Sequence, residues 1–394
     1  MKHCYSAVVG AVGMLLLPFG AGAQSFRSNI LVVPVDVRVL NTQGRPLLGL
    51  AKDDFVVFED GVPQPIVDFT AATGSKEVRR VDRRVFLIDA NRHWLGVTEP
   101  AFGVVDAIVN FVERQLMPDD LVGFSARGRI TDITSDHAGI AEVVRRYHAF
   151  LRSVYRTDRR GLGVRLERIR LEPPNSDLNV ALDEVFAPGS SRTRAAKRST
   201  QDFRALVDQL GKEAAAAAGG GTSRDDREAQ SMARIREAYA RELLADIAAL
   251  KAFDGEKHVI SIGTTSFAST DGDQKIAELA SAARVSVHIL RLTDPRYTQR
   301  EQDLSIQSLT ERTGGLAFLE RLPSEALAEI LRFADSAYHL SYLAPSAVLD
   351  GRAHTIKVQL RKGQKGRVLA RSGYIASNTI PKSDDRPFPL VAVR

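Results

Sequence analysis

Short apolar segments alternate with amphipathic helical segments through the middle of the chain, and this alternation constrains the fold most strongly. The first apolar segment, residues 85–88, ends on Asp89, and an apolar stripe over residues 99–116 predicts the helix that follows. Similar pairs recur as far as residue 334. Strands that alternate with helices form parallel sheets with helices on both faces. We therefore predict an α/β domain with a mostly parallel sheet over residues 83–336.

The same periodicity places the individual elements of this domain. The predicted strands are residues 85–89, 121–124, 129–133, 258–262, 285–290 and 316–319. The predicted helices are residues 99–116, 138–151, 234–253, 274–283, 304–312 and 323–334, together with a helix that begins near Ser176 or Asp177 and ends at residue 186. Residues 188–230 interrupt the pattern with a basic run, consecutive alanines and consecutive glycines, which predicts a flexible insertion.

Alternating apolar and polar residues predict β-strands before the α/β domain. Residues 30–40 place apolar side chains on one face, namely Val33, Val35, Val37 and Val39. Asp36 and Arg38 then fall on the other face. Asp60 and Gly61 lie between two extended runs, a pattern that predicts a tight hairpin. We expect a small β module over residues 30–72.

A second alternating pattern follows the α/β domain. It predicts strands at residues 338–342, 354–360 and 367–374. We expect these strands to form a β module over residues 337–376, so that small β modules flank the α/β domain on both sides. The last residues, 377–394, are rich in proline and charge, which predicts a disordered tail.

The N-terminus has the order of a secretory signal. Lys2 precedes an apolar stretch at residues 7–17, and Ala21-Gly22-Ala23 matches a cleavage site. The apolar stretch is shorter than the about 20 residues that span a bilayer, which disfavours a membrane anchor. We expect residues 1–23 to be removed and the protein to be periplasmic, in the outer envelope or secreted. The mature chain would then lack the only cysteine, Cys4, and any transmembrane segment.

Three stretches together resemble a known family. They are residues 44–61, residues 86–89 with the α/β pattern behind them, and residues 338–374. They resemble exported bacterial proteins described as von Willebrand factor type A (VWFA)-related domain proteins. The resemblance implies a Rossmann-like VWFA domain flanked by small β modules, and a role in binding rather than catalysis.

The resemblance also implies a metal-ion-dependent adhesion site. In that family the first strand ends in Asp-x-Ser-x-Ser, and these residues bind the cation. Asp89 matches the aspartate, whereas the serine positions hold Asn91 and His93. Ser176 is the best match to the threonine of the second loop, with Asp177 as a nearby alternative. Asp89, Asn91 and Ser176 could bind a hard cation through oxygen atoms, while histidine suits such a cation poorly.

The third loop of the family normally brings another carboxylate. Here strand 258–262 continues into Gly263, Thr264 and Thr265, and no aspartate follows until Asp271. Affinity for Mg²⁺ or Ca²⁺ increases with ligand charge and number, so we expect weak binding at most and no firmly bound cofactor. The alternative is that Asp89 only caps the sheet edge through hydrogen bonds.

The loops around this edge are candidates for contacting a partner. His93, Trp94, Thr264 and Thr265 follow the two strands that would carry the site. Trp94 anchors a partner if it is exposed and is part of the packing if it is buried. We expect a protein or cell-surface partner whose identity the sequence does not contain.

Other functional classes are less favoured. Ser125 follows an apolar strand as in a nucleophile elbow, but the second glycine of that motif is missing. No dense cluster of acids, bases or soft ligands indicates an enzyme, and no nucleic-acid motif accompanies the basic run at residues 192–198. His258 and His288 begin and interrupt apolar strands, where satisfied core or edge histidines are usual. We expect a non-enzymatic binding protein, with a metal-independent envelope scaffold as the alternative and a metal-assisted hydrolase as the less favoured one.

Overall fold

The computed structural model describes most of the expected domains. The described residues are 31–72, 83–90, 99–157, 177–186, 239–263, 270–292, 300–319, 321–344, 352–361, 363 and 365–376. The predicted signal, insertion and tail lie outside these ranges. So do several of the predicted site residues, namely Asn91, His93, Trp94, Ser176, Thr264 and Thr265.

A central sheet with the strand order β10-β9-β8-β5-β6-β7 forms the α/β domain. Its strands are β5 (Arg84–Asp89), β6 (Leu121–Ala126), β7 (Arg129–Ile130), β8 (Glu256–Gly263), β9 (Val285–Arg291) and β10 (Ala317–Leu319). Neighbouring strands are parallel except for β7, which returns antiparallel to β6 through Arg127 and Gly128 at positive φ. The prediction of a mostly parallel sheet is therefore confirmed.

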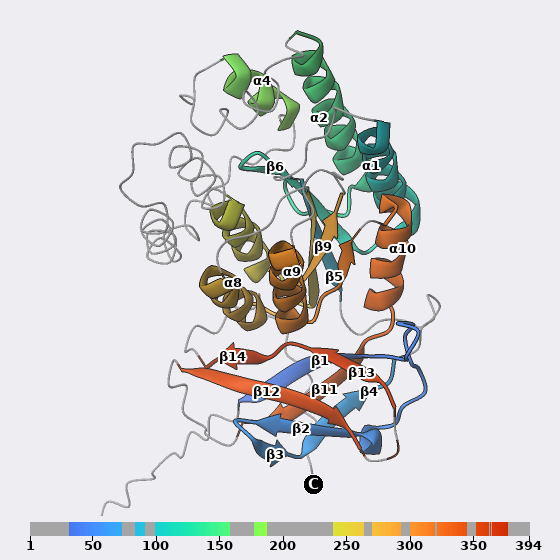
Figure 1. Ribbon diagram of the computed structural model, residues 1–394, viewed down its shortest axis with the longest axis vertical. Coiled ribbons are helices and arrows are strands. Elements are labelled where there is room, and N and C mark those ends of the chain that lie inside the picture. The colour runs from blue at the N-terminus through green and yellow to red at the C-terminus, as the bar shows by residue number, and fades with distance from the viewer. Residues whose placement is uncertain are drawn as a thin grey trace, which may run out of the picture.

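Helices cover both faces of this sheet (Figure 1). On one face lie α1 (Glu99–Asn110), the π-helical turn η2 (Phe111–Gln115), α2 (His137–Thr157), α4 (Asp177–Phe186) and α10 (Pro323–Ala334). On the other lie the helical residues 239–251, α8 (Thr270–Ala282) and α9 (Arg300–Thr313). None of the described helices is both long and apolar enough to cross a membrane.

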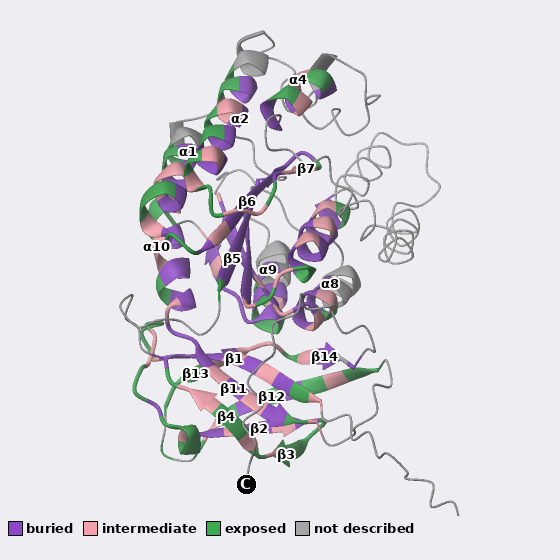
Figure 2. Cartoon of the chain, turned by 180° about the vertical axis from the view of Figure 1, so that it is seen from behind, coloured by how far each residue is buried: buried purple, intermediate pink, exposed green. Residues whose placement is uncertain are grey.

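Strand β5 shows why the sheet needs helices on both faces. Phe86 and Ile88 belong to one buried core, and Val85 and Leu87 belong to the other. Because successive side chains of a strand point to opposite faces, a continuous apolar run requires apolar cover on both sides. Figure 2 shows β5 and β6 buried along their length, with the helices exposed on their outer sides.

The remaining strands form a β-sandwich below the α/β domain in Figure 1. Its sheets have the orders β13-β1-β11-β4 and β14-β12-β2-β3. The strands are β1 (Val32–Leu40), β2 (Phe55–Glu59), β3 (Val62–Gln64), β4 (Ile66–Thr70), β11 (Tyr338–Leu343), β12 (Ala353–Leu360), β13 (Arg367–Ala370) and β14 (Gly373–Ile375), and a 3-10 turn, η1 (Lys52–Asp54), precedes β2.

The two predicted β modules share these sheets instead of standing apart. Strand β1 lies between β13 and β11, and β12 lies between β14 and β2. Each sheet therefore needs strands from both ends of the sequence, and the α/β domain is inserted between the two halves of one sandwich. Hydrophobic patterning predicts strands but not which distant strands pair, which is why the sequence indicated two modules.

Aromatic and valine side chains fill the sandwich. The inward valines of β1, predicted from alternation, are at most 2 % exposed. The ring of Phe55 lies 5.1 Å from that of Tyr338. The Tyr338 hydroxyl donates a hydrogen bond to the Leu47 carbonyl and accepts one from the Leu50 N–H, at 2.9 and 3.1 Å. This tyrosine thus fixes the segment between β1 and β2 to β11.

The predicted strand at residues 367–374 is divided between the two sheets. Strand β13 pairs with β1, whereas β14 pairs with β12. Arg371 lies at the crossing, where its guanidinium donates to the carbonyls of Ser281 and Pro34 at 3.1 and 2.6 Å. The crossing therefore also joins the sandwich to α8 of the α/β domain.

Buried charge joins the two domains at the amino ends of the parallel strands. Arg38 donates from Nε to the carbonyl of Phe333 at 2.8 Å, and its guanidinium forms an ion pair with Glu256. Alternation places Arg38 on the polar face of β1, yet this side chain is only 2 % exposed. Arg38 is buried although it lies on the polar face, because the α/β domain covers that side of the strand.

A pair of histidines continues this buried network. The Leu316 N–H donates to Nδ1 of His288 at 3.2 Å, so a neutral His288 carries its proton on Nε2 and donates it to Nδ1 of His258 at 3.0 Å. Nε2 of His258 then faces Glu256 at 2.9 Å. Both histidines are fully buried, which confirms their prediction as core residues. Burial, followed by neighbouring positive charge, holds the pKa of each well below its usual range.

Because this histidine pair is buried, we expect the folded protein to lose stability in mild acid. Below about pH 6.5 the unfolded chain protonates both histidines while the folded chain does not, so acidification favours unfolding. The free energy of unfolding should fall by up to about 1.4 kcal/mol per pH unit for each histidine. Denaturant unfolding between pH 5 and 8 measures this slope, and the double variant His258→Gln/His288→Gln should show a shallower one. Equal slopes for the two proteins would refute the assignment.

Candidate functional site

Asp89 ends β5 at the carboxyl edge of the central sheet and is 1 % exposed. In the sheet register it lies beside Ser125 of β6 on one side and Ser261 of β8 on the other. The Ser261 hydroxyl donates a hydrogen bond to Oδ2 of Asp89 at 2.7 Å. Paired residues of neighbouring parallel strands point to the same face, so a carboxylate and two hydroxyls gather on one side of the sheet.

The strand order makes this edge a topological switch point. The chain leaves β5 through α1 on one face of the sheet, and it leaves β8 through α8 on the other face. The two connections therefore diverge above β5 and β8, where open α/β sheets form their binding crevices. Asp89 and Ser261 are the side chains joined across this point.

The amino ends of the same strands face the sandwich. Arg84, at the start of β5, forms an ion pair with Asp335 just before β11, and Arg284, just before β9, forms one with Asp36 of β1. The carboxyl edge around Asp89 therefore points away from the sandwich (Figure 1). These contacts between the two domains lie at the opposite end of the strands from Asp89. The chain continues from the Asp89 edge into the segments that follow β5, β6 and β8.

The predicted second loop leads to the same end of the molecule. Helix α4 begins at Asp177, so Ser176 directly precedes it, as the sequence indicates. Arg129 of β7 holds this helix, with Nε donating to Asp183 at 3.0 Å and NH2 donating to Asn179 at 2.8 Å. Because β7 follows the carboxyl end of β6, these bonds hold α4 near this edge.

Sequence reasoning missed the two serines that flank Asp89. The sequence pattern drew attention to Ser125 only through an incomplete nucleophile elbow, and nothing in it singled out Ser261. Both are at most 2 % exposed. The sequence did contain a signal, because each serine places a hydroxyl in an otherwise apolar strand. The strand register then brings both positions beside Asp89. That register depends on strand order, which local patterning does not supply.

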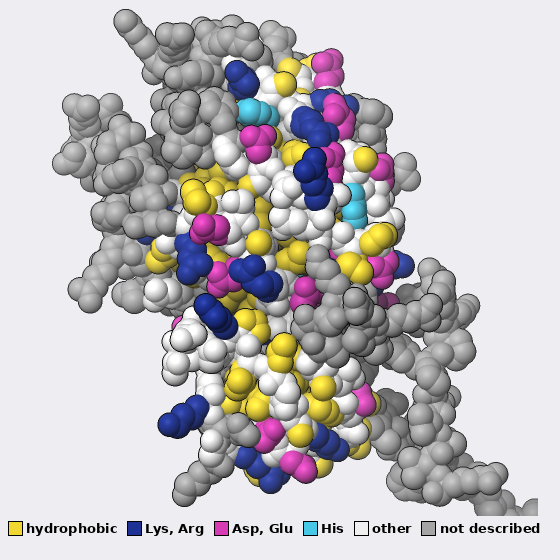
Figure 3. Space-filling model, turned by 90° about the vertical axis from the view of Figure 1, so that its right-hand side faces the viewer, with side chains coloured by type: hydrophobic (Ala, Val, Ile, Leu, Met, Phe, Trp, Pro, Cys, Tyr) yellow, Lys and Arg dark blue, Asp and Glu magenta, His cyan; other side chains and the backbone are white. Residues whose placement is uncertain are grey.

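Two cavities in the described part of the chain lie elsewhere. One of about 620 Å³ opens between the turn at residues 43–46, the approach to β10, and α10. Its lining includes Arg45, Arg321 and Arg332 together with Glu329, and none of the predicted site residues. On the face formed by α1, α2 and α10, positive and negative side chains are mixed (Figure 3). That face offers no continuous surface of one sign for a polyanion.

The site thus offers oxygen ligands and hydroxyl donors. A carboxylate held by a serine hydroxyl is an acceptor of the kind that hard cations and polar partner groups use. A scan against protein-family models and a search of curated proteins find no match to the sequence. The geometry of the described residues therefore carries the functional argument.

Proposed function

We propose that this protein is an exported, non-enzymatic binding protein with a VWFA-like domain. Its partner, a protein or a cell-surface polymer, would contact the segments that follow β5 and β8, including His93, Trp94, Thr264 and Thr265. A degenerate adhesion site built on Asp89, Asn91 and Ser176 would bind Mg²⁺ or Ca²⁺ weakly.

The hydrogen bond between Ser261 and Asp89 at the switch point is the observation that carries this proposal. It positions the one strong oxygen ligand where ligands of open α/β sheets bind. The order of charged, apolar and small residues in residues 1–23 supports export. The polar groups at the edge are a carboxylate and serine hydroxyls, whose oxygen atoms can bind a hard cation.

Replacing Asp89 with asparagine is expected to abolish partner capture. The substitution keeps the shape of the side chain but removes the charge that a cation or a cationic partner group requires. Wild-type protein and Asp89→Asn are immobilised, incubated with the native envelope fraction, and compared for one saturable partner band. We expect at least a tenfold loss, which corresponds to about 1.4 kcal/mol of binding free energy.

Asp68→Asn is the matched control. Asp68 lies on β4 of the sandwich and is exposed, so this variant makes the same chemical change far from the edge. It should capture the partner as the wild type does, and thermal unfolding should show that both variants are folded. Equal capture by all three proteins would contradict the proposed site.

A metal-independent scaffold is the second candidate, and the same hydrogen bond favours it. The Ser261 hydroxyl already occupies one carboxylate oxygen of Asp89 and can hold the sheet edge without a cation. Calorimetric titration with Mg²⁺, Ca²⁺ and Mn²⁺ separates the two candidates. Weak binding that Asp89→Ala removes supports the adhesion site, whereas partner capture without any cation binding supports the scaffold.

A further inference from the structure

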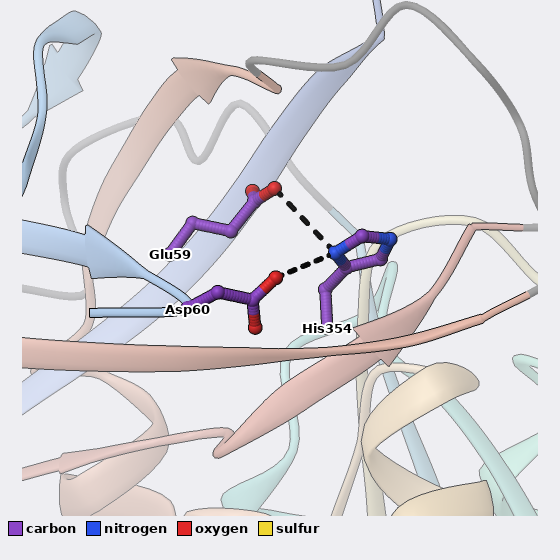
Figure 4. Close-up of side chains that lie close together, drawn as sticks. All are labelled: Glu59, Asp60 and His354. Atoms are coloured by element: carbon purple, nitrogen blue, oxygen red, sulfur yellow. Dashed lines mark hydrogen bonds and ion pairs between the residues drawn. The ribbon is translucent and has the colours of Figure 1, made fainter. Parts of the chain in front are cut away.

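Three potential ligand groups meet on the sandwich, away from the edge described above. Nδ1 of His354 lies 2.8 Å from Oδ2 of Asp60 and 3.8 Å from Oε1 of Glu59. One ligand atom from each residue lies within 4.8 Å of the others (Figure 4). Glu59 is buried, Asp60 is exposed and His354 is intermediate, so the cluster opens to solvent on one side.

The backbone explains why these residues meet. Asp60 and Gly61 have φ of 48° and 82° and form the predicted tight turn between β2 and β3. Strand β12 pairs with β2 as far as Glu59 and then pairs with β14, so His354 comes beside the turn. The ring of His354 stacks on Tyr374 with centroids 5.3 Å apart, which fixes its plane.

Each carboxylate uses one oxygen for a supporting hydrogen bond and turns the other toward His354. Oδ1 of Asp60 accepts from the N–H and the hydroxyl of Thr355 at 2.8 and 3.0 Å. Oε2 of Glu59 accepts from the Tyr374 hydroxyl at 3.2 Å. Hydrogen bonds of this kind orient the ligands of metal sites.

Glu59 supplies a second, independent reason to expect a cation. Its side chain is only 2 % exposed, and no Lys or Arg among the described residues forms an ion pair with it. A buried carboxylate is costly unless a countercharge or a metal compensates it. Among the described residues, the ion-pair partner of Glu59 is the His354 ring at 3.8 Å, which is charged only when protonated.

We propose that Glu59, Asp60 and His354 bind a divalent transition-metal ion, with Zn²⁺ as the best fit. With bonds of about 2.0–2.1 Å, tetrahedral ligands lie about 3.3 Å apart, and the distances of 2.8 and 3.8 Å bracket this value. Imidazole favours Zn²⁺ over Mg²⁺ or Ca²⁺. Water from the exposed side would complete the shell.

Such an ion would hold the two ends of the sequence together. Asp60 and His354 are 294 residues apart in the chain, and the site forms only when both halves of the sandwich assemble. Because metal binds the folded state alone, it raises stability according to its concentration and affinity. This site is independent of Asp89 and of the proposed partner.

Zinc titration of the full chain, first treated with a chelator, tests the proposal. The wild type should bind one Zn²⁺ per chain, and added Zn²⁺ should raise the unfolding temperature. His354→Ala and Glu59→Gln should each weaken binding by at least about 100-fold, and Tyr374→Phe by about 10–100-fold because it removes only a supporting hydrogen bond. Co²⁺ should give the intense visible spectrum of a four-coordinate site in the wild type.

His339→Ala is the matched control. Nδ1 of His339 also pairs with an aspartate, Asp36, at 2.9 Å, but Arg284 neutralises that carboxylate at 3.1 Å. This variant should bind Zn²⁺ like the wild type. The proposal is overturned if the wild type shows no saturable Zn²⁺ binding, or if His354→Ala and Glu59→Gln retain wild-type affinity.

Discussion

Replacement of Arg84 by alanine should lower the free energy of unfolding by about 3–5 kcal/mol, because it removes the cation that compensates the buried carboxylate of Asp120 and the partly buried one of Asp335. Arg84 is 1 % exposed in its side chain and forms ion pairs with Asp120 and Asp335. Its Nε donates to Asp120 at 2.8 Å, and NH1 donates to Asp335 at the same distance. Asp335 lies three residues before the sandwich strand β11, so the loss affects both domains. Urea unfolding followed by circular dichroism measures it.

Arg321→Ala provides the comparison. Arg321 pairs with Glu329 at 2.7 Å, but these side chains are 53 % and 29 % exposed, so solvent screens the pair. Its removal should cost about 1 kcal/mol or less. The double variant Arg84→Ala/Asp120→Ala should be less destabilised than the sum of the single variants, because it removes an unpaired charge. Equal effects of the two arginine replacements would contradict the buried network.

Truncation after Ser336 should abolish the cooperative unfolding of the sandwich. It removes β11 from between β1 and β4, and β12 from between β14 and β2. The N-terminal half then keeps only β1 and β4 in one sheet and the β2–β3 hairpin in the other. Isolated hairpins are marginally stable in water, so residues 31–72 should become sensitive to protease. Limited proteolysis followed by mass spectrometry measures the protease sensitivity of these residues.

Truncation after Ala376 is the control. It removes only residues 377–394, which composition predicts to be disordered, and keeps every described strand. The unfolding midpoint should stay near that of the full chain. If the protein ending at Ser336 keeps the same midpoint and the same protease resistance over residues 31–72, the N-terminal strands form a module of their own, as the sequence suggested.

The central sheet could be predicted from sequence because its signal is local. Residues 85–88 are all apolar, and such a run followed by an amphipathic helix has few alternatives to a buried parallel strand. The same local reasoning placed the inward valines of β1 and the turn at Asp60 and Gly61. These features depend on neighbours in the chain, which the sequence shows directly.

Features that depend on distant pairing could not be predicted. Alternation places Arg38 on the polar face of β1, and only the packing of Phe333 and Glu256 against it buries it. Ser261 becomes part of the site because β8 lies beside β5, 172 residues away. Glu59 and His354 meet because strands from the two ends of the chain share a sheet.

Photo-crosslinking from defined positions tests the proposed binding edge most directly. A photoreactive amino acid is placed at Trp94 or Thr265, in the segments after β5 and β8, and at Val67, which is 46 % exposed on β4 of the sandwich. After irradiation in the native envelope, positions 94 and 265 should yield the same crosslinked partner, and Asp89→Asn should remove it. Crosslinking from position 67 but not from 94 or 265, or a product that persists in Asp89→Asn, would contradict the account.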